Sequence, residues 1–173
     1  MSIGLLAVFF LVTFMIHEFD EIILVRLYLA RAEEWNGPRG FWWRNRSAYI
    51  STKSIAAAIA EEFALAGIGV GLAVFLNAPE VIVGLLIPYC IHLAGHILDA
   101  AMVNRWVPGS VTSLITLPIL IAAAWWFIAV VGVSWLWVAI WAGILAVILI
   151  ANLQFMHRIL MPAVESWLGR VYR

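Results

Sequence analysis

The composition of this 173-residue chain places it in a membrane. Hydrophobic residues make up 65% of it and charged residues only 12%, whereas a soluble domain is about half apolar and about a quarter charged. This excludes a soluble globular protein, a disordered chain and a nucleic-acid-binding protein. The single cysteine, Cys90, excludes a disulfide framework and a cysteine-based zinc or iron–sulfur site.

Long apolar runs predict an all-α fold, a polytopic membrane bundle of five transmembrane helices. A spanning helix needs about 20 apolar residues. Five stretches meet this requirement, at residues 3–27, 53–76, 81–103, 110–131 and 134–157. Pro79, the Pro108–Gly109 pair and Gly132 mark short connections between them. We therefore expect one transmembrane domain, 1–173, with no room for a soluble domain.

The basic residues predict how the bundle is oriented. All ten Lys and Arg fall in or beside the first and third loops or after the fifth span. By the positive-inside rule this side faces the cytoplasm, so the N-terminus is expected outside and the C-terminus inside a bacterial inner membrane. Loop 31–51 mixes arginine with aromatic residues, which is typical of an interfacial segment. Tail 158–173 is expected to be amphipathic and to lie on the same surface.

Acidic and histidine residues lie inside the predicted spans, where a charged side chain costs at least about 2.5–3.5 kcal/mol on insertion scales. They are His17, Glu18, Asp20, Glu21, Glu61, Glu62, His92, His96 and Asp99. No Lys or Arg lies deep in a span to pair with them. Either the carboxylates are protonated or a cation neutralises them, and mixed histidine and carboxylate ligands suit a divalent metal ion.

These polar residues share one depth in the membrane. His17, Glu62 and His96 each lie nine residues from the nearest cytoplasmic cation along their own spans. Because a helix rises about 1.5 Å per residue, the group falls roughly 9–14 Å below the basic layer. A common depth on three spans predicts one shared site.

Helical spacing places these residues on single faces of their spans. His92, His96 and Asp99 follow the i, i+4, i+7 spacing of one helix face, and His17 and Glu21 follow the i, i+4 spacing of another. Di-iron and di-manganese bundles combine two Glu-x-x-His pairs with a Glu from each of two other helices. The present set resembles that arrangement with the order of histidine and acid reversed.

The sequence therefore predicts a site for one or two divalent metal ions, iron or zinc. The predicted metal ligands are His17, Glu21, Glu62, His92, His96 and Asp99. The predicted catalytic acids and bases are Glu18, Asp20 and Glu61. Tyr89 and Asn152 are expected to support the ligands at the same depth.

Two segments of the chain resemble the HXXEE family of small integral membrane proteins. One is His17-Glu18-Phe19-Asp20-Glu21. The other is the His96 helix followed by Trp106-Val107-Pro108-Gly109-Ser110-Val111-Thr112, which is similar to the family's aromatic-x-Pro-Gly-x-x-Thr stretch. The resemblance implies a histidine and carboxylate site in the membrane and no particular substrate. Asp20 departs from the motif, where the first Glu is expected.

The first motif allows a second interpretation. His17-Glu18-Phe19-Asp20-Glu21 also reads as His-Glu-x-x-Glu, similar to the zinc-protease motif His-Glu-x-x-His with Glu21 replacing the second histidine. A protease needs a water-filled cleft, which the apolar spans do not suggest.

These observations favour a metal-dependent membrane enzyme that acts on a lipid or another lipophilic substrate from the cytoplasmic leaflet. The many carboxylates favour di-iron redox chemistry slightly over zinc hydrolysis. A metal-free isomerase or cyclase that uses protonated carboxylates is an alternative, as is a divalent-cation or proton transporter or sensor. Transport is disfavoured because the outer halves of the spans lack ionisable groups. The expected partners are membrane lipids and the lipophilic substrate, with no nucleic acid.

Overall fold

The computed structural model describes residues 2–32, 34 and 51–171, and this part of the chain is helical without a strand. The helices are α1 (Ile3–Ala32), α2 (Thr52–Phe75), α3 (Pro79–Val103), α4 (Ser110–Val131), α5 (Trp135–Phe155), the π-helical turn η1 (Met156–Leu160) and α6 (Met161–Val171). Five helices are long and apolar enough to cross a membrane. This confirms the predicted all-α class and the five spans.

The predicted spans agree closely with the helices. Each of α1 to α5 begins within two residues of its predicted start. The largest difference is at the end of α1, which continues five residues past position 27 to Ala32. Most of the predicted interfacial loop, 31–51, lies outside the described residues.

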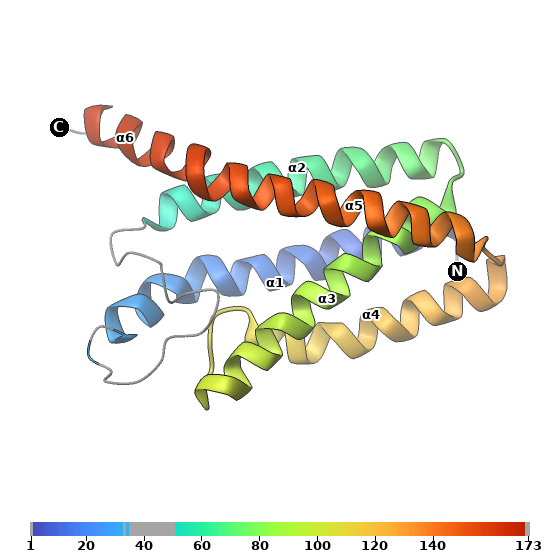
Figure 1. Ribbon diagram of the computed structural model, residues 1–173, viewed down its shortest axis with the longest axis horizontal. Helices are drawn as coiled ribbons and strands as arrows, with labels where there is room; N and C mark the ends of the chain where they lie inside the picture. The colour runs from blue at the N-terminus through green and yellow to red at the C-terminus, as the bar shows by residue number, and fades with distance from the viewer. Residues whose placement is uncertain (1, 33, 35–50, 172–173) are drawn as a thin grey trace.

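The five spanning helices form a bundle that α3 crosses obliquely (Figure 1). α3 packs against α4 and α5, while α1 packs against α2 and α4. The C-terminus and the turn from α3 to α4 lie at one end of the bundle, and the N-terminus and the other two short connections lie at the opposite end (Figure 1). Among the acidic and histidine residues of α1 and α3, His17, Glu18, His96 and Asp99 are buried in this bundle.

The tail is attached to the start of α2 by one carboxylate. Glu165 Oε1 in α6 accepts hydrogen bonds from the Ser51 backbone N–H and the Ser54 hydroxyl, both at 2.7 Å. A negative charge at a helix N-terminus is stabilised by the exposed N–H groups of the first turn. This contact places α6 beside the first turn of α2.

Candidate metal centre

The centre of the bundle holds four candidate metal ligands from two helices. His17 and Glu21 lie on α1, and His92 and His96 lie on α3. Each pair has i, i+4 spacing, which places both side chains on one face of its helix. One nitrogen or oxygen atom from each residue lies within 4.8 Å of those of the other three. Within the described ranges, this is the one group of at least three such residues close enough to share an ion.

The distances between these atoms suit ligands of a single ion. Nε2 of His92 lies 3.3 Å from Nε2 of His17 and 3.2 Å from Nε2 of His96. Nε2 of His96 lies 3.1 Å from Oε1 of Glu21. Two ligand atoms each about 2.0–2.1 Å from a tetrahedral ion are about 3.3 Å apart. The separation of 3.9 Å between His17 Nε2 and Glu21 Oε1 is wider than the other three distances.

Backbone geometry sets the proton position on His96. Its Nδ1 lies 3.0 Å from the carbonyl oxygen of Pro108. A carbonyl can only accept a hydrogen bond, so Nδ1 carries the proton and Nε2 presents its lone pair to the other ligands. Metal-binding histidines are usually oriented in this way, with the second ring nitrogen donating to a carbonyl or carboxylate.

His17 is oriented through a hydroxyl from α4. Its Nδ1 lies 3.2 Å from Thr112 Oγ1 and 3.4 Å from Ser113 Oγ. The Thr112 hydroxyl lies 3.0 Å from Asp20 Oδ2 and 3.1 Å from the Gly109 carbonyl oxygen, and it donates its proton to these acceptors. The same hydroxyl can therefore accept a proton from Nδ1 of His17, which leaves Nε2 free of a proton. In many metal sites the second ring nitrogen of a ligating histidine donates to a carboxylate. Here the Thr112 hydroxyl stands between the ring of His17 and the carboxylate of Asp20.

With protons on Nδ1, His17 and His96 each have a lone pair on Nε2, and these lone pairs are the strongest local indication of a cation. Nε2 of His17 and Nε2 of His96 both face Nε2 of His92 at hydrogen-bond distance. A neutral His92 carries at most one proton on this atom and can donate it to one of the two neighbours. A metal ion would satisfy all three nitrogens together, and a carboxylate oxygen from Glu21 would lower its net charge.

The Pro108–Gly109 turn, which comes directly before α4, lies against the four-residue cluster. Gly109 has a φ of +82°, a backbone conformation that strongly favours glycine. A Cβ atom on Gly109 would lie 2.8 Å from His17 Cε1, 2.9 Å from His96 Nδ1 and 3.1 Å from Glu21 Oε1. The turn thus packs directly against three of the four candidate ligands.

The other residues predicted from the sequence lie around this group. Glu18 and Glu62 line an apolar cavity beside it, together with Tyr89. Glu61 Oε2 accepts a hydrogen bond of 3.2 Å from Asn152 Nδ2, which links α2 to α5. The Tyr89 ring stacks on the His92 ring with centroids 6.2 Å apart.

Two predicted ligands stand apart from the four. Asp99 is buried one turn beyond His96, and Glu62 faces the cavity. Neither belongs to the group whose ligand atoms come together. Their role as ligands stays a prediction, as do the catalytic roles of Glu18, Asp20 and Glu61.

Sequence reasoning did not identify three site residues. Pro108, Gly109 and Thr112 supply a carbonyl, a close backbone surface and a hydroxyl to the ligands. The signal that could have found them is the Pro-Gly-x-x-Thr stretch, whose position in a tight turn before α4 brings it to the cluster.

Fold and cluster together define a helical membrane protein with a buried histidine and carboxylate group. Residues 8–123 match the family described as "Protein of unknown function with HXXEE motif". The match covers more than half of the chain, so the chain belongs to the HXXEE family. It includes all four cluster residues and the Pro108–Gly109 turn. No curated protein and no solved structure matches the chain.

Proposed function

We propose that this protein is a metal-dependent integral membrane enzyme that acts on a lipophilic substrate. One observation carries the proposal: His92 belongs to the four-residue cluster and also lines the adjacent apolar cavity. A metal held by the cluster would therefore border a space of about 420 Å³ whose lining is mostly aliphatic and aromatic. Ligand pockets of about 300–1,000 Å³ with few polar groups are typical of small-molecule sites.

The ligand set favours one ion of iron or zinc. Three imidazole nitrogens and one carboxylate oxygen suit both metals. The part of the chain that the structure describes offers one such group, and the other two predicted ligands, Glu62 and Asp99, lie outside it. Of the one or two ions that the sequence allowed, we therefore propose one, in a mononuclear centre. When bound, the ion would supply Lewis acidity, and iron would add redox chemistry.

The residues around the centre are metal ligands, residues that orient a ligand, and carboxyl groups that can transfer protons. His17, Glu21, His92 and His96 hold the ion. Thr112 and Asp20 keep His17 in its metal-binding tautomer. Glu18 and Glu62 point at the cavity, where each carboxyl could give or accept a proton from a bound substrate.

The distribution of charge supports a cytoplasmic position for this site. The described cations are Arg26, Arg31, Lys53, Arg105, Arg158 and Arg170, and all lie on segments at the end of the bundle that holds the C-terminus (Figure 1). We propose that this end faces the cytoplasm and that the N-terminus is outside, in a bacterial inner membrane. The centre then lies in the cytoplasmic half of the bilayer.

A lipid comparison tests the proposed function. Cells that lack the chain would be complemented with wild type, His96→Ala or His157→Ala, and their membrane lipids would be profiled by mass spectrometry. His96→Ala should match the cells without the chain, because it removes a metal ligand. His157→Ala should match wild type, because His157 lies in η1 beside Met161 Sδ at 3.4 Å, away from the cluster. Identical lipid profiles in all strains would contradict an enzyme of lipophilic substrates.

A further inference from the structure

A second, narrower space lies next to the cavity beside the cluster. The first space holds about 420 Å³ and touches His92, and the second holds about 130 Å³. They share four lining residues, Phe14, Glu62, Tyr89 and Leu149. These four side chains border both spaces, which lie next to each other between α1, α2, α3 and α5.

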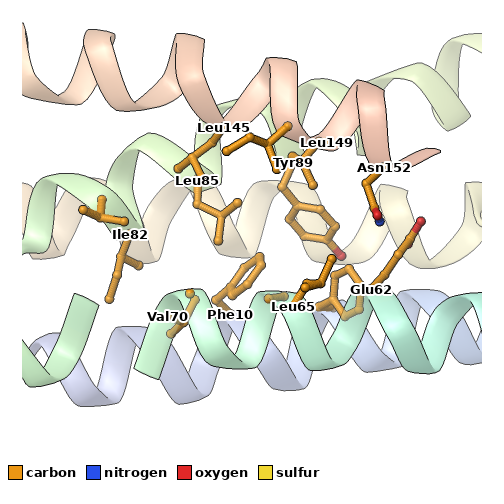
Figure 2. A pocket seen from close by; sticks show the side chains of 15 residues that line it. Phe10, Glu62, Leu65, Val70, Ile82, Leu85, Tyr89, Leu145, Leu149 and Asn152 are labelled. Carbon is orange, nitrogen blue, oxygen red and sulfur yellow. The ribbon is translucent and has the colours of Figure 1, made fainter. Parts of the chain in front are cut away.

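The polar groups of the narrower space gather at one end. Glu62, Tyr89 and Asn152 lie at this end, and the opposite end is formed by aliphatic side chains such as Val70 and Ile82 (Figure 2). From Asn152 to Leu145 the lining of α5 covers seven residues, or about 10 Å at 1.5 Å per residue. The space therefore suits an extended hydrocarbon chain with a polar group at the end near Tyr89.

Tyr89 carries an unused hydrogen-bonding group at that end. Its side chain is 5% exposed, and its hydroxyl is the one buried side-chain oxygen or nitrogen in the described residues without a hydrogen-bond partner. A buried hydroxyl left without a partner costs about 1–3 kcal/mol. Tyr89 lines both spaces. An oxygen atom of a bound molecule would supply the missing partner.

The charges of the lining limit which molecule can bind. The described residues that line the two spaces include Glu18 and Glu62 and no Lys or Arg. An anionic headgroup, such as a phosphate or a fatty-acid carboxylate, would lose its hydration beside two acidic side chains. An ion held at His92 is the one cation that the proposed function places near the cavity, and Glu21 already offsets part of its charge. An uncharged oxygen, as in an alcohol or a carbonyl, meets no such penalty.

The wider space also reaches the lipid-facing surface of the bundle. Ile91 on α3 and Ile150 on α5 line it and are 67% and 62% exposed. α2 and α5 have little direct backbone contact across it, and the hydrogen bond between Glu61 and Asn152 joins them at the cluster end. A molecule dissolved in the bilayer can thus reach the cavity without passing through water.

From these observations we propose that the cavity binds an uncharged single-chain lipid that carries a hydroxyl or carbonyl oxygen. The hydrocarbon chain lies along α5, and the oxygen accepts a hydrogen bond from the Tyr89 hydroxyl beside His92. This assignment rests on the proposed function, because it names the substrate class of the same centre. The binding itself depends on the cavity and can be measured separately from the metal.

Photolabelling of the full protein in nanodiscs, after incubation with iron or zinc, tests this assignment. The probes are a photoreactive long-chain alcohol and the fatty acid of the same chain length, with labelled peptides mapped by mass spectrometry. The alcohol should label α2, α3 and α5 around the cavity, and the acid should label them at least about tenfold less. Tyr89→Phe removes only the hydroxyl and should weaken binding of the alcohol about three- to tenfold. Equal labelling by both probes, or no effect of Tyr89→Phe, would overturn the assignment.

A matched pair on α5 provides the control. Leu149→Trp fills the cavity and should abolish labelling, whereas Val147→Trp adds the same ring to a residue that is 68% exposed and should leave labelling unchanged. Labelling that survives Leu149→Trp would also overturn the assignment. Metal content is measured on the same samples: absence of metal with intact cavity labelling contradicts the proposed function alone, and bound metal without selective labelling contradicts the lipid assignment alone.

Discussion

At the scale of single residues, the candidate centre depends on positions that carry little or no side chain. Gly109 lets the turn before α4 approach His17, His96 and Glu21 to within van der Waals distance. Its positive φ gives the turn the direction that α4 then follows. The ligands are thus confined by backbone atoms, which hold them more rigidly than long side chains would.

Gly109→Ala should therefore remove the metal. The added Cβ would lie under 3.0 Å from atoms of His17 and His96, so these rings must move. We expect metal binding to weaken at least about tenfold, as for disturbed partners of metal ligands. Gly132→Ala is the matched control, because Gly132 also has a positive φ, +70°, but nothing lies within 4 Å of its Cβ position. Equal metal content in both variants, measured by mass spectrometry, would contradict the role of the turn.

Thr112→Val should weaken metal binding by about 10–100-fold, because His17 loses the acceptor that holds its tautomer. Thr116→Val is the control: its hydroxyl donates to the Thr112 backbone carbonyl at 2.8 Å within α4 and touches no ligand. Metal affinity would be measured by competition with a chelator. An affinity for Thr112→Val that equals that of Thr116→Val would show that Ser113, at 3.4 Å from His17 Nδ1, suffices.

The individual ligands could be predicted from the sequence only in part. His17, Glu21, His92 and His96 share depth and helix faces, and the structure brings them together. Depth in the membrane, however, does not determine which side chains meet. That also depends on the rotation of each helix about its axis, which is set by packing. Glu62 has the same depth as His17 but lies on α2, which presents it to the cavity. Thr112 was missed because its position depends on the turn at Gly109.

At the scale of the helices, one close contact joins α3 to α5. A Cβ atom on Gly84 would lie 2.7 Å from Trp141 Cβ and 3.1 Å from the Ala142 backbone nitrogen. The backbones of α3 and α5 therefore approach each other closely at Gly84, as small residues allow in membrane bundles. This contact supports the wall of the cavity that α5 forms opposite α2.

Gly84→Ala should destabilise the bundle by about 1–3 kcal/mol, because backbone atoms of α5 must shift to admit the methyl group. Gly143→Ala on α5 is the control, since nothing lies within 4 Å of its Cβ position, and alanine is the better helix former. Denaturant unfolding in detergent measures both. If Gly84→Ala unfolds at the wild-type denaturant concentration, the close contact between α3 and α5 is absent.

Helix boundaries were predictable because each has a local chemical cause. Pro79 starts α3, where its missing N–H needs no partner, and Gly109 and Gly132 flank α4. The exception is the end of α1, because the predicted span ends at position 27 and the helix continues to Ala32. The helix continues because Tyr28, Leu29 and Ala32 are buried against α2 and its neighbours.

At the scale of the whole molecule, the account depends on which side of the membrane the cations face. A reporter fused after Arg173 should read as cytoplasmic, and a reporter inserted near Asn77, between α2 and α3, should read as external. The end of α6 and the connection between α2 and α3 lie at opposite ends of the bundle (Figure 1). Reversed readings would place the centre in the outer half of the bilayer and contradict the proposed access from the cytoplasmic leaflet.

The metal content of the purified protein tests the central claim most directly. We predict one iron or zinc ion per chain in wild type and in His157→Ala, and little metal in His17→Ala or His96→Ala. The double variant should be hardly worse than either single variant, because ligands of one ion act as a unit. A wild-type protein that binds neither metal after purification and reconstitution would contradict the account, as would separate, additive losses from His17 and His96.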